Sequence, residues 1–170
     1  QNIWKMGGLK KYLPITHAVM ILGSLSLVGI PPFSGFFSKE LLIEAAHYCR
    51  LPAAGFAYWG LVLSVFVTAL YSFRLLFVVF YGPAREGKHK QVVESPPVIY
   101  IPLLCLTVPT LMLGIALVDS VLFERFSAAI MPKPNHDVMR VLYGQFEWEG
   151  GMILHSFSTL PFWLAVSGIV

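Results

Sequence analysis

The chain has 170 residues, of which 56% are hydrophobic and only 12% charged, and its mean hydropathy is +0.71. Soluble domains rarely combine these values, so the composition indicates a membrane protein. Its apolar runs are continuous rather than alternating, which favours helices over a β-barrel. The net charge of +3 is spread between these runs, which argues against a nucleic-acid partner. We predict an all-α, polytopic transmembrane helical bundle in contact with the lipid bilayer.

The first apolar stretch, residues 13–48, follows a basic segment, residues 1–12. It is longer than the roughly twenty residues of one span. Within it, Pro31 and Pro32 remove backbone donors and Gly35 weakens helix preference. We therefore predict a discontinuous transmembrane helix broken at this point.

The expected halves of this broken helix are Ile15–Gly29 and Phe37–Tyr48. Irregular backbone at membrane depth persists only where protein or a water-filled cavity covers it, so the break predicts a buried, solvated site. The alternative is that the first half spans the bilayer alone and the second half lies at the far surface.

Four further segments follow in chain order. They are a transmembrane helix at 56–81, a loop at 82–97, a transmembrane helix at 98–118, and an interfacial helix (Val121–Met131) with its loop at 119–151. A final apolar run, 152–170, is interpreted as the start of a truncated helix, and both ends of the chain look cut from a longer protein.

Basic residues indicate the orientation. They occur before the first span and in the loop after the second, as Lys5, Lys10 and Lys11 and as Arg85, Lys88 and Lys90. Transmembrane proteins concentrate such residues in cytoplasmic loops. The sequence therefore places residues 1–12 and 82–97 on the cytoplasmic side and residues 119–151 on the outer side.

Lys39 directly follows the break. An ammonium group in a weakly hydrated site is poorly solvated, so it can release and rebind a proton near neutral pH. Glu40 and Glu44 share one helix face, and Lys39 points about one hundred degrees away from Glu40. The two carboxylates can influence the lysine charge through water and neighbouring groups. Alternatively, Lys39 snorkels to an interface and the two acids favour a helix N-terminus, and spacing alone slightly favours this interpretation.

With Lys39 and Glu40, two more residues within apolar runs, His17 and Arg74, are the candidates for proton transfer. Arg74 lies inside the second span, where it either has an interhelical partner or extends toward the basic loop. His17 either relays protons at the mouth of a channel or is a hydrogen-bonded structural histidine, which is commoner. We assign Asp119 to the interface and no role to the remaining histidines, His47, His89, His136 and His155.

Several kinds of chemistry have no motif in the sequence. Cys49 and Cys105 are far apart and have no ligand spacing, which suits packing rather than a disulfide or metal site. Nucleotide-binding, haem-binding and acyl-transfer motifs do not occur. We therefore expect no cofactor and no redox chemistry in this chain.

The order and spacing of residues in the first half resemble the antiporter-like subunits of NADH:quinone oxidoreductase (respiratory complex I), in particular subunit L. Beyond Pro83 the resemblance rests on hydropathy alone. The matching stretches are Lys5-Met6-Gly7-Gly8-Leu9-Lys10-Lys11-Tyr12-Leu13-Pro14, Gly23-Ser24-Leu25, Gly29-Ile30-Pro31-Pro32-Phe33-Ser34-Gly35-Phe36-Phe37-Ser38-Lys39, Thr68-Ala69-Leu70-Tyr71-Ser72-Phe73-Arg74 and Phe80-Tyr81-Gly82.

The resemblance implies that Lys39 ends a proton path toward the outer side and that quinone reduction elsewhere in the complex drives its protonation changes. Glu40 stands where relatives often have Asp. The resemblance also implies NADH, FMN, iron–sulfur clusters and quinone in partner subunits, contacts with other membrane subunits of complex I, and a bacterial inner (cytoplasmic) membrane. There are three alternatives: a large subunit of Mrp-type sodium/proton antiporters, a membrane-bound hydrogenase subunit, and a structural segment that moves no ion.

Overall fold

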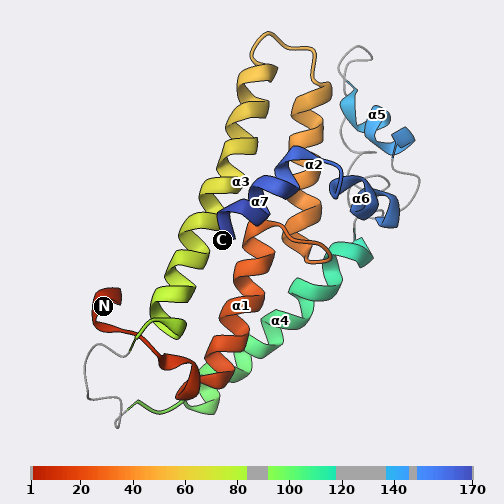
Figure 1. Cartoon of the computed structure of the whole chain (residues 1–170). Helices are drawn as coiled ribbons and strands as arrows, with labels where there is room; N and C mark the ends of the chain where they lie inside the picture. The colour runs from red at the N-terminus through yellow and green to blue at the C-terminus, as the bar shows by residue number, and fades with distance from the viewer. Residues whose placement is uncertain (1, 84–91, 118–136, 146–148, 170) are drawn as a thin grey trace.

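The computed structural model describes residues 2–83, 92–117, 137–145 and 149–169 (Figure 1). In this part all regular structure is helical, which confirms the predicted all-α fold class. The elements are two 3-10 turns, Ile3–Lys5 (η1) and Leu9–Lys11 (η2), a π-helical turn, Phe77–Tyr81 (η3), and seven α-helices: α1 (Pro14–Val28), α2 (Ser34–Tyr48), α3 (Ala54–Leu76), α4 (Pro97–Leu117), α5 (Val138–Gln145), α6 (Glu149–Ser156) and α7 (Leu160–Ile169).

Within the described residues, two helices have the length and apolar character to cross a membrane. They are Ala54–Tyr81, which joins α3 to its π-helical end, and α4, and both expose large apolar side chains along much of their length. Because such a surface is unfavourable in water, it suits contact with lipid or with neighbouring helices. The chain is thus an all-α membrane bundle.

The helices α1 and α2 follow one another along the length of α3, and α4 packs against both of them (Figure 1). The short helix α7 crosses this group and packs against α3, where a Cβ added to Gly168 would lie 2.7 Å from the Cβ of Ala69. Such an approach requires glycine. The result is a bundle in which the α1–α2 junction lies inside rather than at an end.

The α1–α2 junction follows from the residues within it. Gly29 ends α1 with φ +90, a left-handed conformation, and its N–H bonds back to Leu25 and Ser26. The two prolines after Ile30 do not continue the helix, and α2 begins at Ser34. The second half therefore starts three residues before the expected Phe37. Gly35, predicted to be part of the break, lies in the first turn of α2, because glycine weakens a helix without ending it.

The two halves are held in close contact at the break. The amide of Gly35 donates a 3.4 Å hydrogen bond to Ser26 Oγ, and a Cβ on Gly35 would overlap the carbonyl oxygen of Ser26. On the other side, a Cβ on Gly114 of α4 would lie 2.6 Å from the Cα of Ser34. Helix α4 therefore covers the Ser34 side of the irregular backbone, whereas Pro32 is exposed.

At the opposite end of α1, the segment before α4 returns to the start of α1. Leu13, the N-cap residue, provides no side-chain acceptor, but Glu94 accepts hydrogen bonds from the Ile15 amide and the Thr16 hydroxyl. Partial burial raises the pKa of Glu94, but these hydrogen bonds and those from neighbouring amides outweigh it and hold the pKa below its ordinary value. The carboxylate thus acts as the cap that α1 lacks.

The described parts of segments 1–12 and 82–97 meet at this same end. Lys10 lies over the ring of Tyr81, and Gly7 packs against the carbonyl of Pro83. The cytoplasmic assignment of this end stays a prediction. The three basic loop residues on which it partly depends (Arg85, Lys88 and Lys90) lie outside the described residues, as does the expected interfacial helix at 121–131.

The last apolar run differs from the expectation of one helix starting near residue 152. It forms α6 and α7, separated by a turn in which Ser158 and Thr159 donate hydroxyl hydrogen bonds to the carbonyls of His155 and Ser156. Serine and threonine commonly end helices through such local bonds, and Pro161 then suits the first turn of α7. The turn brings α6 beside α2.

Candidate functional site

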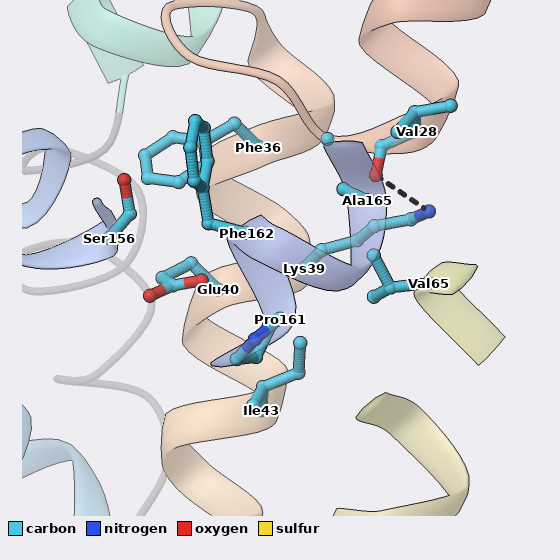
Figure 2. A pocket seen from close by; sticks show the side chains of 11 residues that line it. Val28, Phe36, Lys39, Glu40, Ile43, Val65, Ser156, Pro161, Phe162 and Ala165 are labelled. Carbon is cyan, nitrogen blue, oxygen red and sulfur yellow. Dashed lines mark hydrogen bonds between the residues drawn. The ribbon is translucent and has the colours of Figure 1, made fainter. Parts of the chain in front are cut away.

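Lys39 extends from the first half of α2 back across the helix break. Its ammonium group donates a 3.4 Å hydrogen bond to the carbonyl oxygen of Val28, the last residue of α1, and Figure 2 shows this bond. The side chain is half-buried, and its Cδ lies 3.2 Å from where a Cβ on Gly29 would be. The break therefore provides both the acceptor and the space for this lysine.

A cavity of about 20 Å³ adjoins Lys39, which is room for about one water molecule. Residues of α1, α2, α3, α6 and α7 line it: Val28, Gly29, Phe36, Lys39, Glu40, Ile43, Val65, Ser156, Pro161, Phe162 and Ala165. Most of this lining is apolar, so Lys39 and Glu40 are the ionisable groups that face the space. Of the predicted proton-transfer residues, the structure brings these two to one cavity.

Glu40 is only 5% exposed, and its Oε1 atom has no hydrogen-bond partner among the described residues. Figure 2 shows its carboxylate on the α6 side of the cavity, beside Ser156, whereas Lys39 points the other way toward Val28. The lysine and the acid thus share a cavity without forming an ion pair. A buried carboxylate in this state has a large electrostatic cost unless it binds a proton or a cation.

Glu44 and His155 extend the polar region beyond Glu40. Glu44, one helical turn further along α2, is 8% exposed, and His155 is exposed in the last turn of α6. One side-chain ligand atom from each of the three residues lies within 4.8 Å of the others. The sequence indicates the carboxylate pair through its spacing, but nothing in the sequence indicates that α6 places His155 beside it.

The structure places His17 away from Lys39, near the start of α1. It is 8% exposed, its Nε2 lies 3.2 Å from the Tyr81 hydroxyl, and its ring centroid lies 5.0 Å from that of Phe80. The same hydroxyl accepts a 3.5 Å hydrogen bond from Lys10. These contacts fit a hydrogen-bonded histidine near the basic end of the bundle, and they leave its predicted relay role untested.

Arg74 lies on the exposed side of α3, with its guanidinium 5.7 Å from the ring centroid of Trp4. Val65, which lines the cavity, is nine residues earlier on α3, or about 13 Å along the helix. The structure therefore does not bring Arg74 to the cavity. Its described neighbour is an aromatic ring near the chain's start rather than an acid.

The remaining candidates lie elsewhere. Cys49 and Cys105 are free cysteines, and His47 packs by its ring against Tyr48 and Tyr58. Asp119, His89 and His136 lie outside the described residues.

Comparisons with known proteins match the sequence of this chain to one family. A family profile described as "NADH:quinone oxidoreductase/Mrp antiporter, TM" matches residues 1–80, which include the break and Lys39. NADH-quinone oxidoreductase subunit L of Neisseria meningitidis serogroup A is 37% identical over an alignment that covers the whole chain and 28% of the relative. The similarity therefore extends beyond the first half in which the motifs occur.

Relatives named NADH-ubiquinone oxidoreductase chain 5 match as well. NADH-ubiquinone oxidoreductase chain 5 of Marchantia polymorpha is 38% identical over 78% of this chain, and that of Phytophthora infestans is 40% identical over 67%. The chain spans only about a quarter of the length of the subunit L relative, and 21% and 18% of these two. The chain belongs to the antiporter-like membrane subunits of NADH:quinone oxidoreductase, and its similarity to subunit L covers its whole length.

Proposed function

We propose that this chain is the part of a proton-translocating, antiporter-like subunit in which Lys39 is the terminal proton carrier. In this proposal, the parent NADH:quinone oxidoreductase couples quinone reduction to proton pumping. The observation that supports it is the position of Lys39, which crosses the helix break to the Val28 carbonyl and lines a water-sized cavity with Glu40.

A proton carrier alternates between a protonated and a deprotonated form, and the two forms must have similar free energies. The described surroundings of Lys39 suit both forms, because the Val28 carbonyl accepts from an ammonium while no carboxylate among the described residues forms an ion pair with it. A permanent ion pair would hold the charged form. The half-buried position destabilises that form, so modest electrostatic changes from partner subunits are enough to shift the balance.

The cavity defines a route for the proton from Lys39 to Glu40. The cavity has room for one water molecule, which would carry a proton released by Lys39 toward Glu40, whose Oε1 is without a partner in the described structure. Glu44 and His155 continue from Glu40 toward the exposed surface of α6. We assign this path to the outer half-channel, and we place His17 and Arg74 at the inner end as groups that adjust the local charge.

The redox parts of the reaction belong to other subunits in this proposal. NADH, FMN, iron–sulfur clusters and quinone bind there, and charge changes reach Lys39 through contacts with other membrane subunits. The location we propose is a bacterial cytoplasmic membrane, since subunit L of Neisseria meningitidis matches over the whole chain.

The test is Lys39→Ala in the full-length parent subunit, with Lys11→Ala as the matched control because Lys11 is an exposed basic residue of the first segment. After assembly is confirmed, proton pumping and NADH:quinone electron transfer are measured in sealed vesicles. Pumping that falls below the electron-transfer rate, or a joint fall of both, supports the proposal. Unchanged pumping in Lys39→Ala leaves a structural role for this segment.

A further inference from the structure

On the α6 side of the cavity, the structure places three potential metal ligands together. Glu40 and Glu44 are one turn apart on α2, and His155 comes from the last turn of α6. A carboxylate oxygen from each acid and a ring nitrogen from the histidine lie within 4.8 Å of one another. The cluster joins segments more than one hundred residues apart, so it depends on the fold rather than on local sequence.

Burial distinguishes this cluster from an ordinary acidic surface patch. Both carboxylates are more than nine-tenths buried, and Glu40 Oε1 has no described hydrogen-bond partner. Two neighbouring carboxylates in such a site repel one another and are poorly hydrated. Their ionised forms are therefore unfavourable unless a positive charge lies between them. Lys39 does not supply that charge, because its ammonium is directed to Val28 on the other side of the cavity (Figure 2).

We propose that Glu40, Glu44 and His155 bind a divalent transition-metal ion of the Zn²⁺ class. One imidazole nitrogen and two carboxylates form a donor set that suits Zn²⁺ better than Ca²⁺ or Mg²⁺, which prefer all-oxygen ligands. Zn²⁺ binds such atoms at about 2.0–2.2 Å, so the three side chains must close by rotation about their terminal bonds. The adjoining cavity has room for a water molecule as the fourth ligand.

A metal ion bound here would replace the proton on these side chains, because metal ligands must be deprotonated. The site therefore goes beyond the proposed proton path, and its test measures metal binding rather than pumping. The assembled parent complex is treated with chelator, dialysed and titrated with radioactive Zn²⁺, and bound zinc is counted per complex. We expect one saturable site in the wild type whose affinity falls at least tenfold in Glu44→Gln and in His155→Ala. His47→Ala is the matched control, since His47 is an exposed histidine on the same helix as the two acids.

Zinc K-edge absorption on the wild-type complex with one equivalent of Zn²⁺ gives a second measurement that needs no variant. The expected coordination is one imidazole nitrogen with oxygen ligands at about 2.0–2.2 Å. Equal zinc affinity in the wild type and in both variants, or a sulfur or imidazole-free ligand set, would overturn the site and show that the carboxylates share a proton instead.

Discussion

The ammonium nitrogen of Lys39 lies 3.4 Å from the carbonyl oxygen of Val28, on the other half of the broken helix. That carbonyl is one of the last four of α1, which have no partner within their own helix. The break therefore frees an acceptor in an apolar region, and the lysine uses it. Substitutions of Lys39 test the donor of this hydrogen bond, and substitutions of the glycines at the break test the backbone that holds the acceptor.

Replacement of Lys39 by Arg tests whether the residue must lose its proton. Arginine keeps the positive charge and donates hydrogen bonds, but it does not deprotonate in proteins. We expect Lys39→Arg to assemble normally and to impair pumping as strongly as Lys39→Ala, measured as protons moved per NADH oxidised. If Lys39→Arg pumps like the wild type, the residue acts only as a fixed charge.

Gly29→Ala tests the backbone conformation that directs Lys39. At φ +90 an alanine costs about 1–2 kcal/mol, and its Cβ would lie 3.2 Å from the lysine Cδ. We expect a lower thermal dissociation temperature of the assembled complex and a partial loss of pumping. Gly60→Ala in α3 is the control, because nothing lies within 4 Å of its added Cβ; equal effects of the two substitutions would contradict the strain argument.

Gly35→Ala tests the contact between the two half-helices. The new Cβ would overlap backbone atoms of Ser26, which cannot rotate away, so α1 and α2 must separate. Such overpacking typically costs about 1–3 kcal/mol. We expect less assembled complex on native gels, whereas Gly23→Ala, which has open space around its Cβ in α1, should leave assembly unchanged. Normal assembly of Gly35→Ala would mean that this contact is not tight in the membrane.

The main elements were predictable because their causes are local. Apolar runs of about twenty residues indicate spans, and the Pro31-Pro32 pair indicates where a helix ends. The start of α2 and the division of the last run into α6 and α7 were not predictable in detail. Each is accompanied by a hydrogen bond that sequence spacing does not specify, from the Gly35 amide to Ser26 Oγ and from the Thr159 hydroxyl to the Ser156 carbonyl.

The candidate site was predictable only in part. Helical spacing places Glu40 and Glu44 on one face and directs Lys39 elsewhere, as Figure 2 shows for Lys39 and Glu40. The approach of His155 is a long-range contact between α2 and α6, and the single sequence contains no signal for it. Similarly, the hydrogen bonds from Ile15 and Thr16 to Glu94 connect residues about eighty positions apart.

Glu94→Gln tests the cap at the start of α1 and its dependence on pH. The folded-state pKa of Glu94 lies below its ordinary value, so the carboxylate contributes stability above that value and loses it as the pH falls through the folded-state pKa. At neutral pH, loss of the charge should cost about 1 kcal/mol, the usual effect of an N-cap. We therefore expect about fivefold lower hydrogen-exchange protection of the Ile15 amide, which donates a 2.9 Å bond to Glu94.

The difference between the wild type and Glu94→Gln should shrink in acid, once the wild-type carboxylate is itself protonated. Hydrogen exchange with mass spectrometry, corrected for the intrinsic rate at each pH, measures both effects in peptides that contain residues 14–17. Val93→Ala is the control, because Val93 is the exposed neighbour of Glu94 and should not change protection of α1. A difference that persists undiminished in acid would show that side-chain shape, rather than the charge of Glu94, caps the helix.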